Sequence, residues 1–131
     1  MTQGTNVAAS ADQHTPEALR DLVLALLDDR SGMNLVALDV REASGFTDYM
    51  IIVTGTSPRH VKTLASHVME ETKACGFERI GVEGLESLDW VLIDLADVVV
   101  HVMRESTRQY YDLERMWAEI DPASVDLPEG A

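Results

Sequence analysis

The sequence predicts an α/β fold in which three helices flank a mixed sheet of about five strands. Stretches with helical spacing of apolar residues alternate along the chain with apolar runs of strand length. Two of these runs are separated by only two residues and must therefore be antiparallel, which makes the sheet mixed. With 131 residues, the chain has room for one domain.

The first helix is expected to begin after Thr15 and to end at Ser31 and Gly32. Thr15 is a favourable N-cap, and Pro16 suits the first helical position. Apolar residues then recur at the spacing of one buried helix face, at Leu19, Leu22, Val23, Leu26 and Leu27.

Two strands are expected at residues 35–39 and 49–53. Apart from the closing Asp39, both runs are apolar at every position. Strands without alternation are usually covered on both faces, so we expect both of them in the interior of the sheet.

A second helix is expected after Ser57, with Pro58 at its first position and Gly76 at its end. A returning strand near residues 79–82 would complete a βαβ unit. Its crossover would be right-handed if the two strands are parallel.

The last elements are a hairpin and a helix. Strands at 90–95 and 98–103 are joined only by Ala96 and Asp97, which predicts an antiparallel hairpin. Residues 106–109 match a capping box that opens a helix. We expect this helix to bury Tyr110, Leu113 and Trp117.

The two ends read as tails. Residues 1–14 lack periodicity, and residues 121–131 contain two Pro, one Gly and three acids, so both are expected to be disordered around a domain at 15–120. The N-terminal residues show no signal-peptide pattern, no apolar run reaches membrane length, and the single Cys75 cannot form an internal disulfide. We therefore expect a cytoplasmic protein without membrane contact.

Net charge narrows the class of partner. Ten Lys and Arg oppose 23 Asp and Glu, a formal charge of −13. Such a chain is repelled by phosphate backbones and anionic lipid, so we expect no extensive nucleic-acid contact. A basic protein remains a suitable partner.

One loop has the position of an anion site. Thr56, Ser57, Arg59 and His60 lie between a predicted strand and a helix N-terminus, where free N–H groups attract anions. A capped helix start explains the same residues, because the loop has one Gly, no phosphate-loop Lys, and Pro58 without an N–H.

Catalytic and metal sites have weaker candidates. His60 and His67 are seven residues apart and have no Cys or Asp at ligand spacing, so we expect no metal and no cofactor. Asp39 and Asp94 each close an apolar strand, where ligand sites often gather. Asp in that position also commonly makes only local turn hydrogen bonds.

The most informative segment is residues 80–103. It contains five acids and neither Lys nor Arg, and Trp90 lies in its middle. A Trp surrounded by acids can anchor a basic protein surface, with the acids steering the encounter. The alternative is a core Trp on a strand whose acids simply face solvent. The acids are Glu83, Glu86, Asp89, Asp94 and Asp97.

Seven short motifs then carry a family resemblance and run in order through residues 19–117. They are Leu35-Val36-Ala37-Leu38-Asp39-Val40, Thr47-Asp48-Tyr49-Met50-Ile51-Ile52, Thr54-Gly55-Thr56-Ser57-x-Arg59-His60-Val61, Gly81-Val82-Glu83-Gly84, Asp89-Trp90-Val91-Leu92-Ile93-Asp94, Asp97-Val98-Val99-Val100-His101-Val102-Met103 and Tyr110-x-x-Leu113-Glu114-x-x-Trp117. In these motifs the chain resembles the ribosomal silencing factor family, also called RsfS or Iojap.

The resemblance implies a nucleotidyltransferase-like α/β domain that is not an enzyme. It implies a repressor of translation that binds the large ribosomal subunit through large-subunit ribosomal protein fourteen and sterically blocks joining of the small subunit. It also implies a homodimer when the protein is free. On this match Trp90 and Asp89 are the central contact candidates, and the supporting candidates are Glu83, Gly84, Asp94 and Asp97.

Two departures qualify the resemblance. The family usually carries Gly at the position of Ala96, where a tight turn often needs a positive φ. Active nucleotidyltransferases hold their metals with two carboxylates one residue apart on a strand, whereas here Asp48 is followed by Met50 at the second place. The alternative function is a divergent nucleotide-binding or nucleotidyltransferase-like domain that uses the loop at residues 55–60.

Overall fold

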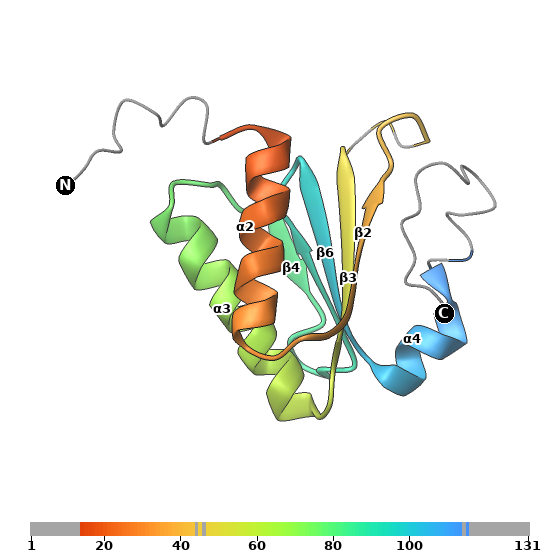
Figure 1. Ribbon diagram of the computed structural model, residues 1–131. Coiled ribbons are helices and arrows are strands. Elements are labelled where there is room, and N and C mark those ends of the chain that lie inside the picture. The colour runs from red at the N-terminus through yellow and green to blue at the C-terminus, as the bar shows by residue number, and fades with distance from the viewer. Residues whose placement is uncertain (1–13, 44, 46, 114, 116–131) are drawn as a thin grey trace.

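A mixed five-stranded sheet with helices on both faces forms the body of the molecule (Figure 1). The computed structural model describes residues 14–43, 45, 47–113 and 115. The predicted α/β class, with its mixed sheet and three flanking helices, is confirmed within this range. The elements are α2 (Pro16–Asp29), β2 (Met33–Asp39), β3 (Tyr49–Gly55), α3 (Pro58–Ala74), β4 (Gly81–Glu83), β5 (Trp90–Asp94), β6 (Val98–Arg104) and α4 (Glu105–Tyr111).

The two long helices begin where their caps predict. The Thr15 Oγ1 accepts a hydrogen bond from the Ala18 N–H at 3.0 Å, and the Ser57 Oγ accepts one from the His60 N–H at 3.1 Å. Each bond satisfies a donor that the helix itself leaves unpaired. No helix in the described part of the chain is long and apolar enough to cross a membrane.

The sheet order is β2-β3-β6-β5-β4, and only β3 and β6 are parallel neighbours. The two strands of the expected βαβ unit, β3 and β4, run in the same direction. They are not neighbours, because β6 and β5 lie between them. The reason lies in the strands themselves. The β6 strand is buried at every residue except Arg104 and takes the centre, whereas the three-residue β4 takes an edge.

The prediction that β2 lies in the interior of the sheet was wrong. It is an edge strand, antiparallel to β3, with an irregularity in register between Met33 and Val36. Its apolar character has another cause, since both of its faces are covered. Val36 and Leu38 belong to one core cluster, and Leu35 packs against the other. Coverage of a strand's faces does not reveal whether its edge is paired.

The two faces of the sheet carry separate cores. On the two-helix face, β-strand residues such as Ile51, Ile93 and Val100 pack against α2 and α3. The opposite face, here called the α4 face, has a smaller core to which Trp90 and Leu113 pack. This core consists of Val36, Leu38, Val40, Met50, Ile52 and Met103.

The last helix departs from its prediction. It begins at Glu105, and its N-cap Arg104 makes no side-chain cap bond, so the predicted capping box from Ser106 is not the start. Tyr110 was predicted to be buried and is 82% exposed. Arg108 instead faces the sheet and is buried, and a residue two positions further lies on the opposite side of a helix.

The remaining predictions at the ends concern residues largely outside the described range. Leu113 lies past the end of α4 and is only partly buried against the core of the α4 face, whereas Trp117 and the tail at 121–131 are not described. The domain boundaries therefore stay predictions. Of the N-terminal tail, only His14 is described; its ring lies 4.5 Å from that of Phe77 and its Nε2 lies 3.1 Å from the Cys75 carbonyl oxygen.

Candidate protein-binding site around Trp90

Trp90 begins β5 on the α4 face and is partly exposed. Its indole Nε1–H donates to the Nδ1 of His101 at 2.9 Å. Its ring centroid lies 4.7 Å from that of Tyr111 with the planes tilted by 50°, an ordinary geometry for an aromatic pair. The indole is thus held by a hydrogen bond and by a ring contact, while part of its surface remains open to solvent.

The loop before Trp90 requires Gly84. This residue has φ +93°, and a Cβ added to it would lie 2.0 Å from the Trp90 carbonyl oxygen. The Leu88 N–H donates to the Gly84 carbonyl at 3.0 Å and closes the loop. Only glycine allows the backbone to approach Trp90 this closely without displacing it.

Asp89 lies at the same end of β5 and is partly neutralised. Its Oδ1 accepts from the Arg104 Nη1 at 3.1 Å, and its carbonyl accepts from the Arg104 N–H at 3.0 Å. The Asp89 side chain is 52% exposed, so the ion pair is screened and adds little stability. The carboxylate therefore remains accessible to a partner.

Two further predicted site residues, Glu83 and Asp94, lie on the neighbouring strands β4 and β5. The register places Glu83 opposite Leu92 and Asp94 opposite Val99, which puts both acids on the α4 face with Trp90. Asp94 lies four positions after Trp90, about 13 Å along the strand. The Asp94 Oδ1 also accepts from the Ala96 N–H at 2.9 Å, the local turn bond that was its alternative explanation.

Asp97 lies at the far end of the hairpin from Trp90. It belongs to the turn between β5 and β6, and its carbonyl accepts from the N–H groups of Asp48 and Tyr49, each at 3.0 Å. The structure therefore brings Trp90, Asp89 and Gly84 together, with Glu83 and Asp94 along the same face and Asp97 remote. Their role in binding a partner stays a prediction.

Two aromatic residues at this surface were not predicted to lie there, and one of them, Tyr110, was predicted to be buried. Tyr111 is 51% exposed and contacts Trp90, and the more exposed Tyr110 lies with its ring centroid 4.9 Å from that of Tyr111. The three rings form a row that begins in β5 and ends on α4. The available signal was the helical period, since placing Arg108 toward the sheet turns Tyr110 outward.

His101, on the central strand β6, is the acceptor for Trp90. It is 5% exposed, and its burial lowers the pKa to about 4. Its Nε2 is buried without a hydrogen-bond partner in the described part of the chain. Because β5 and β6 were already predicted to pair, the juxtaposition of residues 90 and 101 was within reach of sequence reasoning.

The loop proposed for anions is occupied by its own contacts. The Thr56 N–H donates to the Nδ1 of His60 at 2.8 Å, and the His60 Nε2 lies 2.9 Å from the Arg30 carbonyl. His60 thus ties the loop to the end of α2, while its own N–H is used by the Ser57 cap. Arg59 is exposed. A capped helix start accounts for this geometry, and anion binding stays a prediction.

The candidate carboxylate pair does not form. Asp39 lies on β2 and Asp94 on β5, with β3 and β6 between them. Hydrogen bonds from the Arg41 guanidinium lower the pKa of Asp39, and the Arg41 Nε lies 2.9 Å from its Oδ1. Among the described residues, no group of three His, Cys, Asp or Glu side chains is placed to hold a metal ion. His67 instead lies 3.1 Å from the Asp29 carboxylate.

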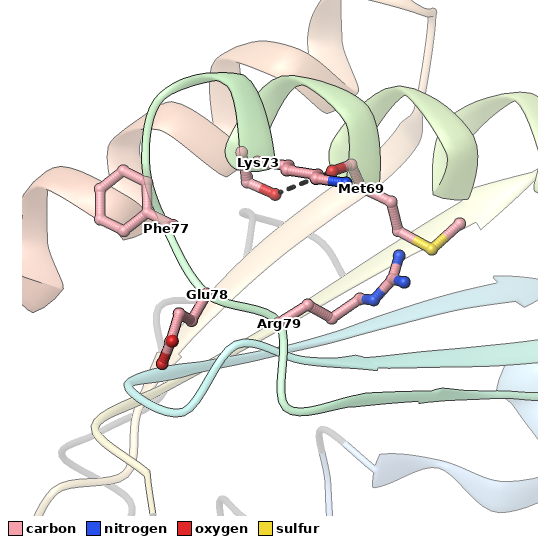
Figure 2. A pocket seen from close by; sticks show the side chains of 6 residues that line it. Met69, Lys73, Phe77, Glu78 and Arg79 are labelled. Atoms are coloured by element: carbon pink, nitrogen blue, oxygen red, sulfur yellow. Dashed lines mark hydrogen bonds between the residues drawn. The ribbon is translucent and has the colours of Figure 1, made fainter.

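Two hollows lie away from Trp90. One of about 300 Å³ lies between the end of α3 and the segment that enters β4. Figure 2 shows the side chains of Met69 and Arg79 pointing toward one another across it, with Phe77 at its other end. A second, of about 650 Å³, lies at the carboxyl ends of β3 and β6 and includes Thr54 and Arg104. Trp90 lines neither of these two hollows.

Comparisons with known proteins agree on one family. A family model described as "Ribosomal silencing factor during starvation", RsfS, matches residues 12–130. A ribosomal silencing factor RsfS of Haemophilus influenzae is 43% identical over 101 residues, which are 77% of this chain and 99% of that protein. A maize chloroplast protein named Iojap is 29% identical over 91 residues, 70% of this chain and 39% of that protein.

Solved structures agree with the fold. A crystal structure of a Chromobacterium violaceum protein matches with a TM-score of 0.78 and 39% identity, over 79% of this chain and 87% of that one. A Bacillus halodurans structure matches with a TM-score of 0.71 and 37% identity, over 77% of this chain and 94% of that one. The nucleotidyltransferase-like label for this topology stays a prediction. On the matches of sequence and structure together, this chain belongs to the RsfS family of ribosomal silencing factors.

Proposed function

We propose that this protein silences ribosomes by binding, without catalysis, in the cytoplasm. It docks on the large ribosomal subunit through large-subunit ribosomal protein fourteen and blocks joining of the small subunit sterically. The observation that carries the proposal is the partly exposed Trp90, fixed in place within a segment that has five acids and neither Lys nor Arg. The family membership supports a ribosomal target.

The aromatic row supports a protein partner. Trp and Tyr are enriched among the residues that dominate binding energy at protein interfaces. Trp90 is held by His101 and Tyr111 before any partner arrives, so little side-chain freedom remains to be lost on docking. The exposed Tyr110 and Tyr111 extend the apolar area beyond the single indole.

Charge supports a basic partner. The net charge of −13 disfavours contact with ribosomal RNA, whereas the acids beside Trp90 complement a basic protein surface. Exposed acids at the edge of an interface mainly accelerate the encounter and orient it. Contacts with ribosomal RNA are therefore expected to be few and confined to the edge of the docked surface.

Co-sedimentation with purified large subunits tests the site. The wild-type protein should comigrate, and Trp90→Ala combined with Asp89→Ala should weaken binding by about 30-fold or more, the usual effect of losing an interface anchor. Met33→Ala is the matched control, because Met33 is an apolar residue that is 47% exposed on β2, the edge of the sheet opposite β4. Absence of wild-type comigration at low salt, or full binding by the double variant, would sink the proposal.

Two further measurements separate partner from mechanism. Isolated large-subunit ribosomal protein fourteen should bind the wild-type protein and not the double variant. If the wild type binds large subunits but not the isolated ribosomal protein, then the proposed partner is wrong. Light scattering on mixing the two subunits should show slower joining when the large subunit is preloaded. Joining at an unchanged rate on a saturated large subunit would contradict the steric block.

We also propose that the free protein forms a homodimer. The β4 edge of the sheet is unpaired in the described chain, and the exposed Ile80 lies beside it. An unpaired edge next to an apolar side chain is a surface that a second copy can cover. Light scattering should show a dimer mass at micromolar concentration, and monomer mass across that range would contradict the claim.

A further inference from the structure

We propose that His101 is the positioning residue for Trp90: its Nδ1 accepts the indole proton and thereby sets which face of the ring is offered to the partner. The inference rests on the proposed function, because it concerns the same surface. It adds a residue that lies inside the sheet and touches no partner.

The register of the hairpin creates the contact. Trp90 is paired with Met103 and Leu92 with His101, so residues 90 and 101 are diagonal neighbours on the α4 face. Diagonal positions are within reach of aromatic side chains. The ring centroids lie 5.7 Å apart, and the Nε1-to-Nδ1 distance is 2.9 Å, a well-formed hydrogen bond.

The bond defines the protonation state of the imidazole. To accept the indole proton, Nδ1 must carry no proton, so a neutral ring carries its single proton on Nε2. His101 is 5% exposed, and burial keeps its pKa at about 4, which leaves the ring neutral at physiological pH. The acceptor is therefore present whenever the protein is folded near neutral pH.

The same arrangement is costly for the core. The Nε2 atom is buried without a hydrogen-bond partner in the described range, and a buried donor without a partner is unfavourable. An apolar side chain in this central strand would avoid that cost, as the neighbouring Val100 and Val102 do. What an apolar side chain cannot supply is an acceptor for Trp90.

Loss of the acceptor at position 101 would change the orientation of the Trp90 indole. Its N–H would stay buried without a partner or turn toward solvent, and the second outcome is favoured because an unsatisfied buried donor is costly. Tyr111 contacts the ring but supplies no described hydrogen bond to Nε1. We therefore expect the ring to lose its single orientation when position 101 cannot accept.

A matched pair of variants tests the inference. Asn and Leu have the same branching and the same number of side-chain heavy atoms, but the Asn Oδ1 lies close to the place of the histidine Nδ1 and can accept. Leu is the better core residue and should be at least as stable as Asn. A purely structural role predicts that function follows stability, whereas positioning predicts that His101→Asn retains function and His101→Leu loses it.

The first measurement is made on the free protein by NMR. The Trp90 indole N–H signal, identified by its loss in Trp90→Phe, should exchange slowly with water in the wild type and in His101→Asn. In His101→Leu it should exchange at least about tenfold faster, as expected when a net hydrogen bond is lost. Unchanged exchange in His101→Leu, with His101→Phe as a second variant without an acceptor, would overturn the inference.

The second measurement is affinity for purified large subunits. His101→Asn should bind within about threefold of wild type, and His101→Leu about tenfold more weakly. Tighter binding by the Leu variant than by the Asn variant would overturn the positioning role. If the wild type does not bind subunits, the proposed function fails, while the exchange measurement still decides whether His101 orients Trp90.

Discussion

The two faces of the sheet use apolar side chains in different ways. On the two-helix face, residues such as Leu64 and Ile51 are completely buried and make no described polar contact through their side chains. On the α4 face, the smaller core is flanked by Trp90, which is partly exposed and hydrogen-bonded to the buried His101. The two-helix face therefore mainly stabilises the fold. The α4 face is less stabilising, because it holds the Trp90 ring in one orientation at the surface.

The largest expected effect separates stability from binding. Leu64→Ala on the two-helix face should lower the free energy of unfolding by roughly 2–5 kcal/mol, because it leaves a cavity in a fully buried cluster. Urea unfolding measures this loss, and the folded protein should keep its affinity for large subunits. Leu92→Ala on the α4 face is the matched change, and it should cost only about 1 kcal/mol, because Leu92 is partly exposed.

If the effects of Leu64→Ala and Leu92→Ala on stability and affinity were exchanged, then the two faces would not differ as described. A loss of subunit affinity in folded Leu64→Ala would mean that the two-helix face also contributes to the site. An affinity loss confined to Leu92→Ala would instead sharpen the division between the faces.

A second expected effect is a pH dependence carried by His101. Its pKa is about 4 in the folded protein against an ordinary 6.5, so the unfolded chain binds the extra proton more readily. The contribution of His101 to the free energy of unfolding is therefore constant above about pH 6.5. It falls as the pH drops toward 4, by about 3 kcal/mol in all. Urea unfolding at several pH values measures the slope.

The control for this slope is His101→Leu, which cannot titrate at that position. The difference between the two pH profiles removes the contributions of the acids and of the other histidines. Parallel profiles between pH 4 and 6.5 would mean that His101 is not held in its neutral form.

A third effect distinguishes two glycines of one hairpin. Gly84→Ala should cost about 2 kcal/mol and weaken subunit binding, because the added Cβ would collide with the Trp90 carbonyl and φ is +93°. Gly81→Ala should change little, since no atom lies within 4 Å of an added Cβ there. Thermal unfolding and co-sedimentation measure both variants, and equal behaviour of the two would contradict the role given to the loop.

The smallest expected effect is a gain. Ala96 has φ +72° in the turn between β5 and β6, where the Asp97 N–H donates to the Leu95 carbonyl at 2.9 Å. Ala96→Gly should relieve this strain and stabilise the fold by about 0.5–1 kcal/mol, after allowing for the greater freedom of glycine when unfolded. A small rise in melting temperature with unchanged subunit binding is expected, because the turn lies at the opposite end of β5 from Trp90.

The helix starts show how far local sequence reaches. Thr15 and Ser57 cap their helices through bonds to residues three positions away, so the determinants lie within one turn. The positive φ at Ala96 was likewise expected from the two-residue connection between strands. By contrast, the edge position of β2 depends on which strand pairs with β3 across more than forty residues, and β6 occupies that place.

The candidate site shows the same division. The composition of residues 80–103 singled out Trp90, Asp89 and Gly84, and the structure brings these three together at one end of β5. It leaves Asp97 in the distant turn and uses Asp94 to close that turn, at the end of β5 where the predicted hairpin had already placed both acids.

By itself the sequence determined the class of fold, the starts of the two long helices, the hairpin and the acidic segment centred on Trp90, since each depends on contacts among residues close in the chain. Only the tertiary structure decided that Tyr111 packs on the indole and that Tyr110 lies outside. Those contacts require α4 to return across the sheet beside β5. Long-range packing sets the orientation of a ring, and no local spacing encodes it.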